Sequence, residues 1–133
     1  MSLKLERPLI FLDIETTDKE ISSSRICSLA IIKENPDGTV ERKYRLINPT
    51  IPISDGAILI HGITNEKVAQ EKTFKNISKG LFEFMSGCDF VTYNGNNFDI
   101  PILAEEFLRC GINFPEPNTR LLDAFSIFLK ESP

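Results

Sequence analysis

The segment Pro8–Thr17, P-L-I-F-L-D-I-E-T-T, constrains the fold of this 133-residue chain more than any other. Its apolar run, Leu9–Leu12, combines β-branched and aromatic residues and predicts a buried strand. Alternate side chains on a strand share a face, so Asp13 and Glu15 would project side by side from its end. Carboxylates held that close repel, and their burial is costly unless a cation compensates. A divalent metal with oxygen ligands would do so, but solvent or pairing with Lys and Arg explains the acids equally well.

The composition indicates one ordinary globular domain, residues 1–133. Hydrophobic residues make up 41% and charged residues 26% of the chain, as is typical of such domains. The net charge of −4, from 15 basic and 19 acidic residues, implies no broad basic surface. Tight nucleic-acid binding through bulk charge is therefore excluded, whereas an enzyme that holds a few nucleotides through metal ions is not.

The cysteines and the apolar runs favour a cytoplasmic protein. Cys27, Cys88 and Cys110 match no zinc or redox spacing, and an odd count argues against a disulfide framework. We expect buried thiols in a reducing compartment. No apolar run approaches the roughly 18 residues of a transmembrane helix, and Asp13 interrupts the early run that would otherwise resemble a signal peptide.

The first half of the chain predicts three antiparallel strands. After the first strand, residues 25–33 form a second apolar run, and residues 34–39 carry the Asp-Gly and Pro signals of a hairpin turn. Residues 40–47 alternate apolar and charged side chains, which predicts a third strand with one exposed face.

The second half predicts β-α units. Ser54 begins a short helix that runs through Ile60 and ends at His61-Gly62, and Thr64 caps a second. Longer apolar periodicities predict helices over residues 73–86 and 99–110, with a strand over residues 89–93, a turn over 94–97, and a strand or helix start over 121–125. The expected fold is α/β: a mixed sheet flanked by helices.

A third acid, Asp99, follows a turn and begins a predicted helix. An acid at this position is favoured by the helix dipole alone. The alternative is a third carboxylate directed at a metal site shared with Asp13 and Glu15.

Three motifs occur in order: F-L-D-I-E-T-T at 11–17, H-G-I-T at 61–64, and N-x-x-x-F-D at 94–99. Together they resemble the DEDD family of 3′–5′ exonucleases, in the DnaQ-like branch that includes polymerase III epsilon proofreading subunits and TREX-type enzymes. The resemblance covers residues 8–125 and implies a ribonuclease-H-like fold.

The resemblance also implies the site. Asp13 would bridge two Mg²⁺ or Mn²⁺ ions, Glu15 would hold one of them and Asp99 the other, for in-line hydrolysis of a phosphodiester that releases nucleoside monophosphates. The expected substrate is the 3′ end of single-stranded or frayed DNA. The residues expected around the terminal nucleotide are Ile14, Thr16, Thr17, His61, Asn94 and Phe98. Of these, Asn94 is expected mainly to shape its turn, and Asp123 is expected to be structural.

One part of the family pattern is missing. The third motif, H-x-x-x-x-D, supplies the general base and a fourth carboxylate, and nothing of that form follows Asp123. We expect the fold to be C-terminally incomplete, and the chain as it stands to be at least about 100-fold less active than one with the motif. Two alternatives stay open: an RNA exonuclease, or an inactive nucleic-acid- or protein-binding module. A DNA polymerase subunit is a candidate partner.

Overall fold

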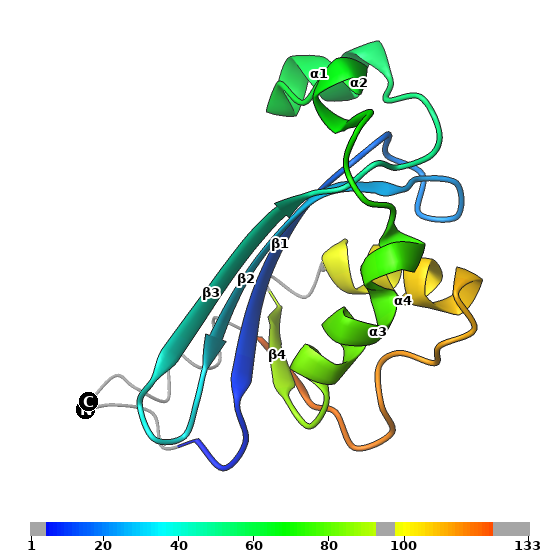
Figure 1. Ribbon diagram of the computed structural model, residues 1–133. Helices are drawn as coiled ribbons and strands as arrows, with labels where there is room; N and C mark the ends of the chain where they lie inside the picture. The colour runs from blue at the N-terminus through cyan, green and yellow to red at the C-terminus, as the bar shows by residue number, and fades with distance from the viewer. Residues whose placement is uncertain (1–4, 93–97, 124–133) are drawn as a thin grey trace.

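A mixed sheet forms the centre of the molecule (Figure 1). The computed structural model describes residues 5–92 and 98–123, and within them five strands pair in the order β3-β2-β1-β4-β5. The first three strands pair antiparallel, and β4 and β5 run parallel to β1. The strands are β1 (Leu9–Thr16), β2 (Ile26–Glu34), β3 (Val40–Leu46), β4 (Asp89–Thr92) and β5 (Leu121–Asp123). The predicted α/β sheet, three antiparallel strands followed by β-α units, is confirmed.

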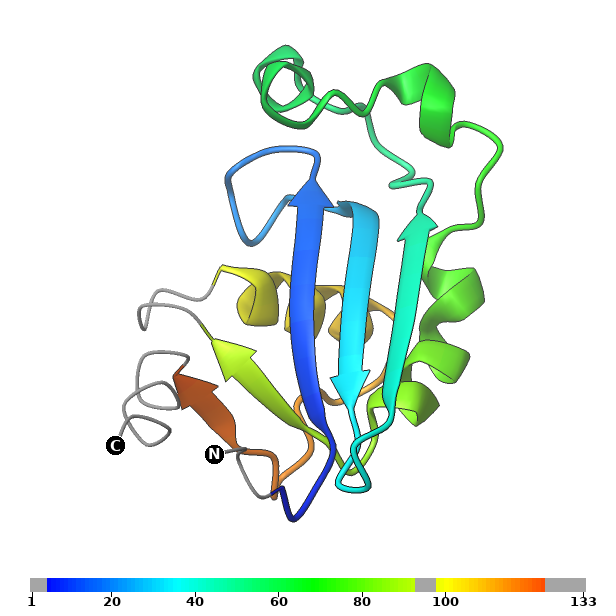
Figure 2. The same cartoon turned by 90° about the vertical axis from the view of Figure 1, so that its left-hand side faces the viewer.

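Two amphipathic helices, α3 (Phe74–Met85) and α4 (Asp99–Arg109), cover one face of this sheet (Figures 1 and 2). Thr73 begins α3 with a reciprocal capping box to Asn76, which satisfies two backbone donors of the first turn. Phe107 of α4 is fully buried, and its ring packs edge-on against Phe74 and Phe82 at centroid distances of 5.0 and 5.7 Å. Both helices lie where the apolar periodicity predicts them, and the main core lies on this face.

No described helix covers the opposite face, called the open face below, which faces the viewer in Figure 2. The edge strand β3 is exposed on both of its faces, so the prediction of a single exposed face was wrong. Val40 and Tyr44, expected to be covered, are 47% and 67% exposed. Their alternation with charged residues indicated a half-buried strand, but the pairing of Tyr44 with Ala30 places them on the open face, which no described helix covers.

The short helices α1 (Asp55–His61) and α2 (Asn65–Val68) stand beyond the carboxyl end of β1 (Figure 1). Residues 53–68, called the cap below, start their helices at the predicted N-caps Ser54 and Thr64, each of which accepts a backbone hydrogen bond. Gly62, at φ 73°, ends α1, in the left-handed conformation that glycine adopts without strain. A second hydrophobic cluster fixes the cap to β2: Cys27, Ile53, Ile63 and Val68.

The parallel neighbours β1 and β4 diverge along their length. Their pairing in the described residues is limited to Leu9 with Asp89 and Ile10 with Phe90, and Figure 2 shows β4 turning away from β1. The second half of β1 therefore has a backbone edge that β4 does not use. A register shift between Glu15 and Thr16 adds a bulge against β2 at the end of the same strand.

The remaining predictions fall partly outside the described residues. Those not described include the predicted turn at 94–97, Tyr93, and the last two residues of the segment 121–125, whose first three form β5. The three cysteines are unpaired, as expected, and Cys27 and Cys88 are buried whereas Cys110 is half-buried. None of the helices in residues 5–92 and 98–123 is long and apolar enough to cross a membrane.

Candidate active site

Two acidic side chains project from the open face of β1. The burial pattern of the strand alternates, with Ile10, Leu12 and Ile14 buried toward the helices. Asp13 is exposed and Glu15 is half-buried on the other face. The two residues lie opposite Ala30 and Ser28 of β2. The strand therefore places the two carboxylates on one face, two residues apart.

Asp99 reaches this strand from α4. As the first residue of the helix, it directs a carboxylate oxygen, Oδ2, to the backbone N–H of Ile14 at an N···O distance of 3.3 Å. That N–H lies on the edge of β1 that β4 leaves unused. Because Ile14 stands between Asp13 and Glu15, this hydrogen bond brings the third acid to the two on the strand.

The surroundings of Asp99 raise its pKa from the ordinary value of 3.8 to about 6. Burial is the largest cause, and the nearby charges of Asp13 and Glu15 add to it, while the hydrogen bond from Ile14 acts in the opposite direction. Desolvation and like charges both disfavour an ionised carboxylate. A raised pKa with such causes is typical of functional sites.

These three acids have no cationic partner in the described part of the chain. The ion pairs found there involve other acids, Asp89 and Glu106. The carboxylates also do not form a finished cage, because no group of three His, Cys, Asp or Glu side chains in residues 5–92 and 98–123 could hold a metal ion as it stands. The chemistry of the donors suits a hard divalent cation, but the side chains are not arranged around one.

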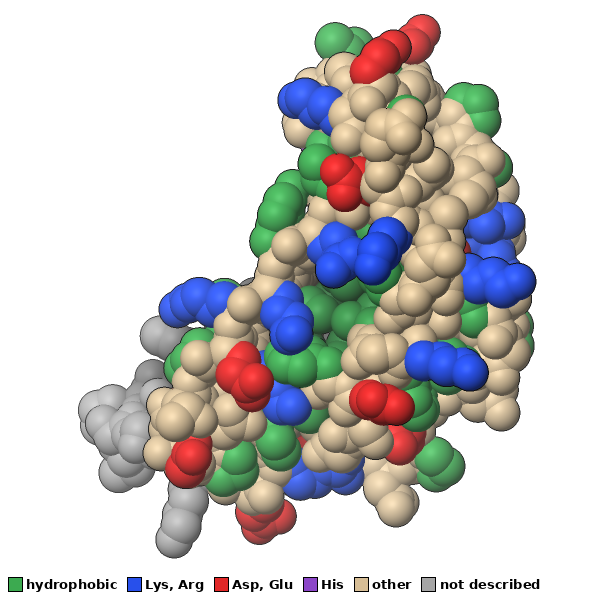
Figure 3. All heavy atoms as spheres, viewed as in Figure 1, with side chains coloured by type: hydrophobic (Ala, Val, Ile, Leu, Met, Phe, Trp, Pro, Cys, Tyr) green, Lys and Arg blue, Asp and Glu red, His purple; other side chains and the backbone are tan. Residues whose placement is uncertain are grey.

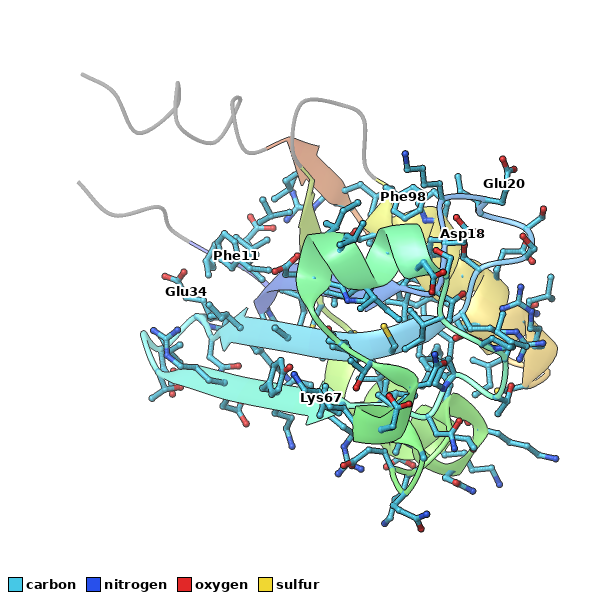
Figure 4. All side chains as sticks on the ribbon, turned by 90° about the horizontal axis from the view of Figure 1, so that it is seen from above. Phe11, Asp18, Glu20, Glu34, Lys67 and Phe98 are labelled. Atoms are coloured by element: carbon cyan, nitrogen blue, oxygen red, sulfur yellow. The ribbon has the colours of Figure 1, made fainter. Side chains whose placement is uncertain are left out.

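A cleft of about 310 Å³ adjoins the acids at the end of β1. The strand contributes Ile14, Glu15 and Thr16 to its lining, the cap contributes Ile60 and His61, and α4 begins beside it at Phe98. Figure 4 labels Phe98 and Asp18, which both line the cleft. The cleft thus combines apolar walls with one carboxylate from the acidic cluster.

His61 lines this cleft, but other parts of the protein occupy both of its ring nitrogens. Nδ1 accepts a hydrogen bond from the backbone N–H of Ile63 at 3.1 Å. The proton therefore lies on Nε2, which donates to the carbonyl oxygen of Thr16 at 3.0 Å. The ring fastens the last turn of α1 to the end of β1. It forms a wall of the cleft, and both of its ring nitrogens have partners within the protein.

The two threonines after Glu15 have different surroundings. Thr16 lines the cleft, and its hydroxyl donates to the carbonyl of Asp18 at 2.7 Å. Thr17 is only 2% exposed, and its hydroxyl accepts the backbone N–H of Arg25 at 3.0 Å. Its side chain supports the loop between β1 and β2, so we do not retain Thr17 among the residues proposed to contact substrate. Asn94 lies outside the described residues.

One supporting residue was missed by the sequence reasoning. Glu106, 3% exposed, accepts the backbone N–H of Ile26 at 2.8 Å and the guanidinium of Arg109 at 3.2 Å. Ile26 is the residue of β2 that faces the bulge at Thr16. Asp99 and Glu106 therefore attach α4 to β1 and β2 through backbone N–H groups. The one available signal was an acid on the apolar side of a predicted amphipathic helix.

Comparisons with known proteins point to exonucleases. A family model described as exonuclease, RNase T, matches residues 10–132. DNA polymerase III subunit epsilon of Haemophilus influenzae is 27% identical over 110 residues, which cover 78% of this chain and 43% of that protein. The 3′–5′ exonuclease DinG of Bacillus subtilis is 26% identical over 108 residues, covering 80% of this chain and 12% of that protein. The chain thus spans less than half the length of these curated relatives.

Solved structures show the same fold. Escherichia coli exonuclease I in complex with a dA13 oligonucleotide superposes with a TM-score of 0.77 at 19% identity, over 92% of this chain and 29% of that one. Apo exonuclease I gives a TM-score of 0.77 at 18% identity, over 93% and 30%. At this level of identity the likeness establishes the architecture of the sheet and helices.

Proposed function

Since this chain belongs to the RNase T exonuclease family, we propose that it is a metal-dependent 3′–5′ exonuclease that releases nucleoside monophosphates from DNA ends. The observation that carries the proposal is the carboxylate of Asp99 on the N–H of Ile14, between Asp13 and Glu15. A sheet that diverges at this point, and a helix that begins there with an acid, concentrate negative charge beside a cleft. Such an arrangement suits cation-assisted chemistry on a phosphate.

Asp13, Glu15 and Asp99 are the residues that would hold Mg²⁺ or Mn²⁺. Three carboxylates without a Lys or Arg partner among the described residues fit hard cations with oxygen ligands. When bound, two such ions supply charge that activates the attacking water and stabilises the leaving oxygen of an in-line displacement. With a pKa of about 6, Asp99 is mostly ionised at pH 7.5 and available as a ligand.

The cleft supports the binding of one terminal nucleotide. Its volume of about 310 Å³ is comparable with that of a nucleotide and too small for a duplex. Ile14, Ile60 and Phe98 offer apolar surface to a base or sugar. His61 keeps α1 against the end of β1 and so sets the width of the cleft. With both ring nitrogens engaged, His61 is assigned a positioning role and not that of the general base.

The size of the cleft favours single-stranded or frayed DNA ends as the substrate. Relatives named as polymerase III epsilon subunits support a DNA polymerase as a candidate partner of the whole protein.

An exonuclease assay of the full-length protein tests the proposed activity, with a 5′-labelled single-stranded oligonucleotide and Mg²⁺ or Mn²⁺. We expect stepwise shortening and release of monophosphates. Asp13→Asn should cost more activity than Asp99→Asn, because a bridging ligand serves both ions. Glu83→Gln, which neutralises an exposed carboxylate on α3, is the matched control and should leave the rate unchanged.

Calorimetry with Mn²⁺ separates metal binding from catalysis. The affinity should fall in Asp13→Asn and stay the same in Glu83→Gln. Equal Mn²⁺ affinity in wild type and Asp13→Asn, or no shortening of the label with either metal, would refute the proposal. A matched RNA oligomer in the same assay decides between DNA and RNA, since a site that contacts the 2′-hydroxyl discriminates the two.

A further inference from the structure

A second hollow lies between β3 and α3, on the side of the sheet opposite the acids. It has a volume of about 320 Å³, and its floor consists of apolar side chains from β2 and α3: Leu29, Ile31, Ile77, Leu81 and Phe84. Figure 3 shows this groove as an apolar hollow with basic side chains beside it. It shares no lining residue with the cleft at the end of β1.

Basic residues without acidic partners border the groove. The ammonium groups of Lys33 and Lys43 both lie over the ring of Phe84, at 4.5 and 4.7 Å from its centroid. Lys43 and Arg45 line the groove and take part in no ion pair within residues 5–92 and 98–123. The nearest acid on β3, Glu41, instead accepts a hydrogen bond from Asn35. In a chain of net charge −4, this is a local concentration of unneutralised positive charge.

Protection of an edge strand does not account for the groove. Charged side chains on an exposed strand such as β3 do prevent edge-to-edge pairing, but that role requires no apolar hollow beneath them. Gly80 of α3 lines the hollow, and a Cβ added there would meet nothing within 4 Å. The hollow therefore has room beside Gly80 for a side chain from another molecule.

We propose that this groove binds an acidic peptide segment of a partner protein that inserts a large apolar side chain over Gly80. The carboxylates of the segment would pair with Lys43 and Arg45, and the apolar anchor would contact Leu81 and Phe84. A nucleic-acid strand is disfavoured because Leu29 and Ile31 face the groove on one side of the sheet while Ala30 lies opposite Asp13 on the other. A strand bound at the acids on the open face would not cross the groove. The partner site is therefore independent of the nuclease cleft.

Selection from a library of random twelve-residue peptides displayed on phage, with the full-length protein immobilised, tests the proposal. We expect enriched peptides to carry a net charge of −3 or lower and at least one Phe, Leu, Ile, Met or Trp. Synthetic copies of the enriched peptides should bind at least about tenfold more weakly to Gly80→Trp, in which the new side chain fills the hollow. They should bind similarly weakly to Lys43→Glu, in which a basic side chain of the groove becomes acidic. Glu83→Trp, at an exposed α3 position outside the groove lining, is the control and should bind normally.

Several outcomes would overturn the proposal. They are no enrichment, enrichment of neutral or basic peptides, and enriched peptides that bind all three variants as tightly as wild type. A fluorescent oligothymidine that loses its binding in Lys43→Glu as the peptides do would assign the groove to nucleic acid instead. Thermal melting followed by circular dichroism checks that Gly80→Trp is folded. If Gly80→Trp does not fold, Lys43→Glu tests the peptide-binding role of the groove on its own.

Discussion

Replacement of Asp99 by asparagine should stabilise the metal-free protein at neutral pH. Asparagine keeps an oxygen that can accept the N–H of Ile14 but removes the charge held near Asp13 and Glu15. Ionisation of Asp99 is less favourable in the folded protein than in the unfolded chain, since its pKa is raised from 3.8 to about 6. The ionised Asp99 therefore destabilises the metal-free protein, and a bound cation would offset this cost.

The sign and size follow from that pKa. Between pH 4 and pH 6 the folded protein keeps a proton that the unfolded chain has released, so the free energy of unfolding falls as pH rises through this range. A shift of about two pKa units corresponds to about 3 kcal/mol. Because Asp99 is only partly buried, solvent screening reduces this to about 1.5 kcal/mol. Asp99→Asn has no carboxyl group at this position, so its free energy of unfolding does not show this fall. Its stability relative to wild type should therefore grow from near zero at pH 4 to about 1.5 kcal/mol at pH 7.5.

Urea unfolding of wild type and Asp99→Asn in EDTA, at pH 4 and pH 7.5, measures the difference. With a slope of about 1–3 kcal/mol per molar urea, the midpoint at pH 7.5 should rise by about 1 M. Glu83→Gln should show the same small difference at both pH values. Added Mn²⁺ should stabilise wild type more than the variant, which keeps only Asp13 and Glu15 as carboxylate ligands. An Asp99→Asn protein that is less stable than wild type at pH 7.5, or equally shifted at both pH values, would refute the electrostatic reasoning.

Three further predictions concern the supporting structure. Asp89→Asn should lower the free energy of unfolding in urea by about 3 kcal/mol, because this 2% exposed carboxylate holds two arginines that tie the N-terminal segment and β5 to β4. Glu106→Ala should cost about 1–3 kcal/mol in the same measurement by leaving the Ile26 N–H without an acceptor, whereas Glu106→Gln should restore most of it. His61→Phe should raise KM for an oligonucleotide more than it lowers kcat, since the ring positions the wall of the cleft; a kcat loss of about 100-fold or more with KM unchanged would indicate a general base instead.

The sequence predicted most of the helices and strands because local signals specify them. Asp13 and Glu15 share a face through the two-residue period of a strand, and Thr73 begins α3 through its own hydroxyl. Three motifs in order were sufficient to predict the family to which the chain belongs. These properties depend on neighbours within a few residues.

Properties that depend on distant contacts were not predictable. The Thr17 hydroxyl accepts the N–H of Arg25, eight residues away, and Glu106 accepts the N–H of Ile26, 80 residues away. His61 was expected beside the substrate, but its two hydrogen bonds depend on how the cap meets β1. Val40 and Tyr44 alternate with charges as a covered strand would, yet coverage is decided by where the helices lie.

The walls of the cleft belong to two separately packed units. Ile14 and Phe98 pack with the main core, whereas Ala57 packs with the cluster of Cys27, Ile53, Ile63 and Val68. Substitutions in the cap can therefore reshape the wall that we propose faces the nucleotide, while the stability of the strand and helix that carry the carboxylates is unchanged. Under the proposed function, the range of substrates could therefore evolve separately from the reaction. Changes within residues 53–68 would alter what the cleft binds, and the carboxylates would stay the same.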